Sequence, residues 1–336
     1  MNPKKIIISR TDSIGDVVLT LPLAGFLKSR FPQCELIFLG RNYTRDVVLL
    51  SDNIDKFISW DEVKDAGAFQ KVNFFKKENA DIIIHVFPDQ EIARSAAQAK
   101  IQYRIGSTGR LYHYRYCNKL VPLSRKNSKL HEAQLNCILL KPLIGKFELP
   151  KLEEIYHHYG FQNFKSKDEE NMALLDSRKF NMILHPKSKG SAREWPMENY
   201  TALIKLLPAD RFKIFVTGTA EEGKMIEGFL QENNSKLTDL TGKFTLKELI
   251  DFIGAADGLI AASTGPLHLA AALDRLAIGI YPPIKPMHPG RWAPIGLNAH
   301  YLVKDKNCND CKKSLHCRCI NEISPQDVLN LILKNA

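Results

Sequence analysis

The sequence predicts an α/β fold built from two parallel sheets, each covered by helices on both faces. Short runs rich in β-branched and aromatic residues alternate with longer segments of helical hydrophobic periodicity, and this alternation is typical of parallel sheets. The alternation stops over residues 148–180, which are polar and rich in charge, and then begins again. A chain of 336 residues is also long enough for two domains of ordinary size.

The first half opens with a strand, a helix and a second strand. Residues 4–9, KKIIIS, form a short β-branched run of the kind found in buried parallel strands. Residues 16–30 place apolar side chains at helical spacing, and Phe31-Pro32 ends that helix. Residues 35–40, ELIFLG, give the second strand. The other elements expected here are strands over 54–60 and 81–87, a helical segment between them, and a helix over 129–143.

The second half repeats the pattern. It begins with an expected strand over residues 181–185, NMILH. The elements expected after it are helices over 197–207, 221–231, 245–255 and 266–273, and strands over 212–217, 258–262 and 277–281. We therefore expect two Rossmann-like domains that face each other across a cleft, over residues 1–165 and 170–325, with a C-terminal helix over 326–336. Ligands of such sheets bind beyond the carboxyl ends of the strands, so the βα turns should carry the chemistry.

The composition indicates a soluble cytoplasmic protein with an anionic partner. No apolar run approaches the roughly 18 residues of a membrane span, and the N-terminal segment is not a secretory signal. Seven cysteines, an odd number, do not suggest a secreted disulfide framework. The net charge of +10 favours nucleic acid, a phosphorylated small molecule or a membrane surface. Residues 92–131 carry nine cations and no acid, with four tyrosines among them.

The first βα turn, residues 10–16, contains neither a GxGxxG fingerprint nor a P-loop. Asp16 falls at or near a helix N-terminus. It could simply stabilise the helix dipole, or it could be an ionised carboxylate that accepts a proton from a hydroxyl.

Three turns of the second half form a candidate anion and nucleotide site. Residues 185–196 combine hydroxyls and cations, including Ser188 and Arg193, just before a helix, although they could be a solvated basic loop. Glu221 and Glu222 open the next helix and could accept hydrogen bonds from ribose hydroxyls or act as first-turn acids. The sharpest of these turns follows the strand over 258–262, and its candidate phosphate ligands are Ser263, Thr264, Gly265 and His268.

Four cysteines lie within twelve residues near the C-terminus: Cys308, Cys311, Cys317 and Cys319. Four thiolates can hold a structural zinc or iron ion, but the spacing differs from that of a standard zinc ribbon. Reduced thiols without a metal are the alternative.

These turns, in this order, resemble those of glycosyltransferase family 9, the ADP-heptose:lipopolysaccharide heptosyltransferases. Arg10–Val17 is similar to the family's [KR]-x-x-x-[IM]-G-D-V opening, and Pro186–Pro196 to its P-G-A-x-x-x-x-K-x-W-P element. Ser263–Leu273 is similar to [DS]-[ST]-G-x-x-H-L-A-A-A-L, and Arg291–Gly296 also fits. The chain departs from the family where Lys187 and Ser188 replace Gly-Ala, where Arg193 replaces Lys, and where Ser263 replaces the Asp of many members.

The resemblance implies a GT-B fold and an inverting, metal-independent transfer of a heptose or related sugar from a nucleotide-diphosphate donor. By the same resemblance, Asp16 is the general base. Ser188, Arg193, Thr264, Gly265 and His268 then contact the donor diphosphate, and Glu221 or Glu222 contacts the nucleoside. Ser263 is a further expected donor contact from its place in the same turn. Arg104, Arg110 and Arg115 are the expected contacts to an anionic glycolipid acceptor at the inner membrane surface. A nucleotide-sugar epimerase of the same shape is the main alternative. A nucleic-acid binder ranks last, because no RNA- or DNA-binding motif accompanies the charge.

Overall fold

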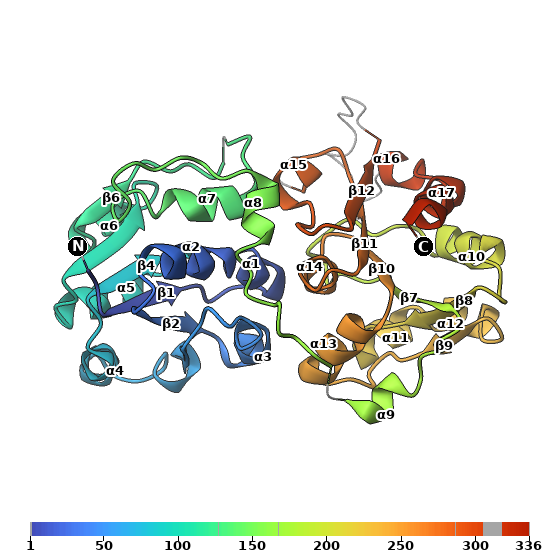
Figure 1. Cartoon of the computed structure of the whole chain (residues 1–336), viewed down its shortest axis with the longest axis horizontal. Coiled ribbons are helices and arrows are strands. Elements are labelled where there is room, and N and C mark those ends of the chain that lie inside the picture. The colour runs from blue at the N-terminus through green and yellow to red at the C-terminus, as the bar shows by residue number, and fades with distance from the viewer. Residues whose placement is uncertain (1, 127, 167, 286, 305–317, 336) are drawn as a thin grey trace. The chain divides into compact units, whose positions relative to one another are not determined.

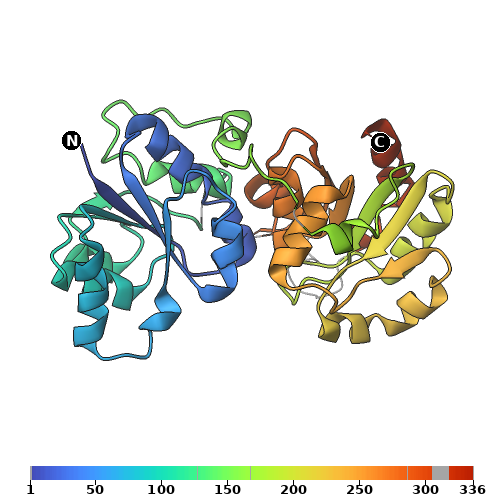
Figure 2. The ribbon, with the colours of Figure 1, turned by 60° about the horizontal axis from the view of Figure 1, so that its bottom comes forward.

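The structure, a computed structural model, describes residues 2–335 except 127, 167, 286 and 305–317. It divides into two compact units, Met1–Asn163 and Phe164–Ala336, which we call unit 1 and unit 2. Each unit contains a parallel sheet with helices packed against it (Figures 1 and 2). The two predicted parallel sheets are therefore confirmed.

In the described part of unit 1, six strands form one parallel sheet in the order β3-β2-β1-β4-β5-β6. The strands are β1 (Lys5–Ser9), β2 (Glu35–Gly40), β3 (Lys56–Ser59), β4 (Ile82–His85), β5 (Tyr103–Ser107) and β6 (Lys119–Val121). The helices are α1 (Ile14–Val18), α2 (Pro22–Arg30), α3 (Arg45–Val48), α4 (Ala68–Glu78), α5 (Gln90–Gln98), α6 (Leu111–Tyr116), α7 (Glu132–Ile138) and α8 (Leu152–Tyr156). Helix α5 packs beside α4 and α6, and α2 packs beside α7.

Unit 2 has the same strand order, read from its own first strand. Its sheet runs β12-β11-β10-β7-β8-β9, again parallel throughout. The strands are β7 (Phe180–His185), β8 (Phe212–Val216), β9 (Leu237–Asp239), β10 (Gly258–Ala261), β11 (Leu276–Tyr281) and β12 (Ala299–Val303). The helices are α9 (Glu169–Met172), α10 (Met197–Leu206), α11 (Ala220–Met225), α12 (Glu227–Glu232), α13 (Leu246–Ala255), α14 (Gly265–Ala272), α15 (Pro289–Trp292), α16 (Arg318–Asn321) and α17 (Pro325–Asn335).

The predicted β-branched runs are the centres of the two sheets. Ile6, Ile7 and Ile8 of β1 are fully buried, because helices cover both faces of the strand. Met182 and Leu184 of β7 lie in the core of unit 2. This core also holds Val328 and Ile332 of α17, which packs against α10, so the C-terminal helix is part of unit 2.

Several elements differ from the sequence prediction. The single helix expected over residues 16–30 is two helices, and Pro22 begins the second because its ring suits the first helical position. The helix expected over 221–231 is likewise divided into α11 and α12. Strands β5, β6, β9 and β12 were not predicted. They are short or partly exposed, so their side chains lack the apolar run that marks β1 or β7.

The strand order sets where each unit can bind a ligand. In unit 1 the chain passes from β1 to β2 and β3 on one side of β1, and then continues with β4 on the opposite side. The switch point, where the strand order reverses direction, therefore lies between β1 and β4. In unit 2 the corresponding strands are β7 and β10. A crevice forms at the carboxyl ends of such strands, and the turns that follow β1, β7, β8 and β10 are the ones that the sequence singles out.

Candidate functional site

The turn after β1 places Asp16 in the first turn of α1, at the switch point of unit 1. Its side chain is 19% exposed. One carboxylate oxygen, Oδ2, accepts a hydrogen bond from Ser13 Oγ at 2.5 Å, and the other forms an ion pair with Arg10. The carboxylate is therefore held in one orientation while part of it remains open to solvent.

Asp12 also forms an ion pair with Arg10, but its surroundings differ from those of Asp16. Arg10 Nε donates to Asp12 Oδ1 at 2.6 Å. Burial, together with the charge of nearby Asp16, raises the pKa of Asp12 to about 6, although Arg10 opposes this shift. The two carboxyls thus share one cation.

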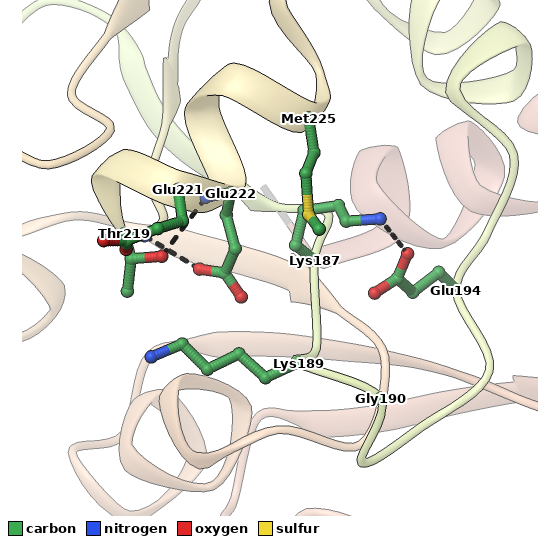
Figure 3. A pocket seen from close by; sticks show the side chains of 8 residues that line it. All are labelled: Lys187, Lys189, Gly190, Glu194, Thr219, Glu221, Glu222 and Met225. Atoms are coloured by element: carbon green, nitrogen blue, oxygen red, sulfur yellow. Dashed lines mark hydrogen bonds and ion pairs between the residues drawn. The ribbon is translucent and has the colours of Figure 1, made fainter.

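Unit 2 contains a pocket of about 220 Å³ at the carboxyl ends of β7 and β8 (Figure 3). Figure 3 shows Glu222 and Met225 of α11 reaching toward the loop that carries Lys187 and Lys189. The pocket is lined by Lys187, Lys189, Gly190, Glu194, Thr219, Glu221, Glu222 and Met225. It therefore combines two cations, three carboxylates and one apolar side chain.

Glu194 organises the loop on one side of this pocket. It forms an ion pair with Lys187, and its Oε1 accepts from Ser188 N at 2.8 Å and from Ser188 Oγ at 2.9 Å. The loop turns at Lys189 and Gly190, whose φ values of 49° and 78° lie in the left-handed region. A left-handed lysine is uncommon and often marks a functional turn.

Trp195 anchors the end of the same loop. Its side chain is buried, its Nε1 donates to Ile323 O at 3.0 Å, and its ring packs edge-on against Tyr200. Trp195 therefore fixes the end of the loop that carries Lys187 and Lys189 to the core of unit 2.

The two glutamates at the start of α11 have different surroundings. Glu222 is buried and closes a capping box, in which its Oε2 accepts from Thr219 N at 2.8 Å. Glu221 is exposed, and hydrogen bonds at the helix start lower its pKa. Both line the pocket, so either carboxylate can meet a ligand hydroxyl. Beneath them, His185 Nδ1 lies 3.0 Å from Thr217 Oγ1, and burial lowers the pKa of this histidine to about 4.

The turn after β10 supplies the other candidate ligands of unit 2. Thr264 is the N-cap residue of α14, yet its side chain makes no capping hydrogen bond. Its Oγ1 is buried and has no hydrogen-bond partner among the described residues. His268 is buried one turn into the helix, and Ser263 is half-buried. Because β10 and β7 are adjacent parallel strands, this turn and the loop with Ser188 and Arg193 leave the sheet at the same edge.

These groups together suit a nucleoside diphosphate. The N-terminus of α14 offers backbone N–H groups and a positive dipole to a phosphate, and Lys187 and Lys189 add cationic charge. The pocket carboxylates can accept hydrogen bonds from ribose hydroxyls, and Met225 offers an apolar surface to a base. Three carboxylates make the pocket itself less suited to a bare anion than to a nucleoside.

The three arginines expected to contact the acceptor lie in different environments. Arg104 is half-buried, and its guanidinium donates to Tyr116 O at 2.7 Å and to Ile101 O at 2.5 Å. Arg110 and Arg115 are exposed at the two ends of α6, beside the exposed Leu111. Of the three, Arg110 and Arg115 are therefore the ones available to an outside anion.

Of the four C-terminal cysteines, Cys308, Cys311 and Cys317 lie outside the described residues. Cys319 is buried in α16, within the core of unit 2. Among the described residues, no three His, Cys, Asp or Glu side chains lie together as metal ligands would.

Sequence reasoning missed three residues of these sites. Arg10 begins a turn and matches the first position of the family motif, but nothing local indicates that it is buried beside two acids. Glu194 and Met225 were not singled out. The one available signal for Glu194 was its position opposite Lys187 in the same loop, seven residues away.

A family model described as glycosyltransferase family 9 (heptosyltransferase) matches residues 74–319 of the chain. A Haemophilus influenzae protein assigned only as a glycosyltransferase is 29% identical over 307 residues, which are 87% of this chain and 86% of the relative. The lipooligosaccharide heptosyltransferase 2 of Campylobacter jejuni serotype O:2 is 24% identical over 351 residues, or 99% of each chain.

Solved structures support the same architecture. A glycosyl transferase family 9 protein from Veillonella parvula superposes with a TM-score of 0.83 at 18% identity, over 99% of this chain and 97% of the other. Escherichia coli heptosyltransferase WaaC with ADP gives a TM-score of 0.73 at 18% identity, over 99% and 100% of the two chains. The fold is therefore GT-B. In the part of the chain that the structure describes, no helix has the length and apolar character to cross a membrane.

Proposed function

Because the chain belongs to glycosyltransferase family 9, we propose that it transfers a heptose from ADP-heptose to a lipopolysaccharide core, with inversion at the anomeric carbon. The observation that carries the proposal is that unit 2 has both this pocket and a buried Thr264 hydroxyl without a partner among the described residues, since together they offer partners for every part of a nucleoside diphosphate. One relative is a lipooligosaccharide heptosyltransferase, and one similar structure is a heptosyltransferase with ADP.

The donor binds to unit 2 through groups of opposite charge. Carboxylates of α11, from Glu222 or Glu221, accept hydrogen bonds from the ribose, and the base lies against Met225. The diphosphate is bound by Thr264, Gly265 and the N-terminus of α14, with further contacts from Ser188, Arg193, Ser263 and His268. A preorganised set of donors of this kind stabilises the charge that develops on the leaving group.

The acceptor hydroxyl attacks the anomeric carbon as the bond between that carbon and the diphosphate oxygen breaks. Asp16 accepts the proton of the hydroxyl, and ADP leaves with the electron pair of the broken bond. A single displacement of this kind inverts the configuration at the anomeric carbon. No metal ion takes part in this scheme, because the cations and the helix N-terminus counter the charge of the diphosphate. We place the reaction in the cytoplasm, at the inner membrane surface.

The direct test supplies ADP-heptose and a heptose-deficient lipopolysaccharide core to the purified protein. We expect a product heavier by one heptose, the inverted anomeric configuration by NMR, and the same rate with and without EDTA. Donor turnover in the absence of acceptor would instead support the epimerase alternative. A thermal-shift series with ADP, UDP, GDP and CMP identifies the base, because a ligand that binds the folded state raises its melting temperature. Stabilisation by UDP rather than ADP would contradict the donor assignment.

The exposed arginines of α6 predict a salt-sensitive acceptor interaction. Replacing Arg110 and Arg115 by glutamine should raise the acceptor KM at low salt severalfold and flatten its dependence on salt. Surface attraction weakens as the Debye length falls from about 10 Å at 0.1 M to about 3 Å at 1 M. The donor KM should change little. Arg104→Gln is the comparison variant. The Arg104 guanidinium donates to two backbone carbonyls, so its loss should lower the stability of the fold rather than change the acceptor KM. Unchanged acceptor kinetics in the double variant would leave residues 92–131 as a solvated basic face.

Metal analysis distinguishes the two interpretations of the C-terminal cysteines, a structural metal site or reduced thiols. If Cys308, Cys311, Cys317 and Cys319 hold a structural ion, protein purified without chelators should contain about one equivalent of zinc or iron. Elemental analysis measures this directly, and a Cys308→Ser/Cys311→Ser variant should lose the metal. Metal-free protein would mean that the four residues are reduced thiols.

A further inference from the structure

Arg10 is a buried cation whose three guanidinium nitrogens are all engaged. It follows β1 directly, and its side chain is 3% exposed. Nε donates to Asp12 and Nη2 to Asp16, while Nη1 lies 3.4 Å from both Glu132 Oε1 and Asn136 Oδ1. A charged group at this depth needs such partners, because the cost of removing it from water is large.

Helix α7 holds the far side of this guanidinium. Glu132, 1% exposed, accepts from Arg125 Nε at 3.0 Å, and Asn136 Oδ1 accepts from Arg125 Nη2 at 2.8 Å. Asn136 Nδ2 in turn donates to Thr20 Oγ1 at 3.2 Å, and Thr20 Oγ1 donates to Asp16 O at 2.8 Å. The network therefore begins at Asp16, passes through α7 and returns to the backbone of Asp16.

We propose that Arg10 is a positioning residue for Asp16 and that Glu132 of α7 sets both the position and the net charge of this network. The proposal rests on the proposed function, in which Asp16 accepts the proton of the acceptor hydroxyl. It adds a role for Glu132 and Asn136 of α7, which are far from Asp16 in the chain and do not touch the reacting atoms.

The geometry explains the positioning. Both oxygens of Asp16 are held, one by Arg10 and the other by Ser13, so the carboxylate cannot rotate freely. A proton acceptor that is held in the productive orientation avoids an entropic cost in the transition state. Lysine at position 10 would keep the charge but would lose the planar fork that reaches Asp12, Asp16 and Glu132 at once.

The charges explain why an acid is buried behind Arg10. Two guanidiniums, of Arg10 and Arg125, face three carboxylates, of Asp12, Asp16 and Glu132. Tyr43 also contacts this group, and its hydroxyl donates to Asp12 O at 2.5 Å. A guanidinium favours the ionised form of a neighbouring carboxyl group and so weakens that group as a proton acceptor. Glu132 adds a negative charge that opposes this effect, and its burial keeps that charge from being screened by solvent.

The test compares four variants by the pH dependence of kcat/KM and by calorimetric ADP affinity. Glu132→Gln keeps the shape but removes one negative charge, so kcat should fall about tenfold and the acidic limb of the profile should move to lower pH. Glu132→Asp keeps the charge and should restore the position of that limb. Arg10→Lys should lower kcat about a hundredfold. Glu153→Gln, at an exposed glutamate of α8, is the matched control and should resemble the wild type.

ADP affinity should stay within threefold of wild type in all four variants, because the donor groups lie in unit 2. Wild-type kcat and pH profile in Glu132→Gln or in Arg10→Lys would overturn the proposal, as would an acidic limb that Glu132→Asp fails to restore. Loss of ADP binding in parallel with kcat would also overturn it, since that result indicates general unfolding.

If Asp16→Asn retains turnover, the proposed function fails. If Asp16→Asn is inactive while Glu132→Gln and Arg10→Lys behave as wild type, only the present inference fails.

Discussion

Replacing Asp16 by asparagine is expected to lower kcat about a thousandfold while ADP affinity stays within threefold. Asparagine keeps the size of the side chain, and its one oxygen can still accept from Arg10 while its Nδ2 donates to Ser13 Oγ, but it cannot take a proton. General base catalysis commonly contributes two to four orders of magnitude, so its loss should dominate the effect of the variant. Steady-state transfer assays and calorimetry with ADP measure the two quantities separately.

Asp46→Asn is the matched control for this prediction. Asp46 is also an acid in the first turn of a helix, α3, but it is exposed. If Asp16 served only to stabilise a helix dipole, both variants would lose a few tenths of a kcal/mol of stability and would keep their activity. Near-normal turnover of Asp16→Asn would therefore remove this residue from the mechanism.

Replacing Thr264 by valine is expected to weaken ADP binding by about 10- to 100-fold without loss of stability. Valine has nearly the same shape and removes only the hydroxyl. That hydroxyl is buried and has no partner among the described residues, so its removal costs the fold nothing. A hydrogen bond to a charged phosphate contributes about 1.5–3 kcal/mol, which sets the expected loss of affinity. Calorimetry and thermal melts give the two results independently.

Thr245→Val is the control, and we expect it to lower stability without changing ADP affinity. Thr245 is the N-cap residue of α13, and its hydroxyl accepts from Glu248 N in a capping box. Its loss should lower stability by about 1 kcal/mol and leave ADP affinity unchanged. Equal ADP affinity of wild type and Thr264→Val would refute the phosphate site at α14, and a stability loss in Thr264→Val would show that the hydroxyl is structural.

The different roles of these two threonines could be predicted only in part from the sequence. Thr245 precedes Glu248 by three residues, which is the pattern of a capping box. Thr264 precedes Leu267 at the same spacing, and Pro266 between them has no N–H to donate. The sequence could thus indicate that Thr264 does not close a capping box. It could not show that the hydroxyl is buried without a partner, because that depends on how β10 and its neighbours pack.

The sequence by itself determined the two parallel sheets, most of their central strands and the turns that carry the candidate ligands. These features depend on local signals: β-branched runs, helical periodicity and the residues that begin or end helices. Only the tertiary structure decided that Asp16 is held by Arg10 and that α7 lies behind this pair. Glu132 is 122 residues from Arg10 in the chain, and no local pattern relates them. Burial of both side chains creates their pairing, since a charge removed from water must find its partner wherever the fold brings one.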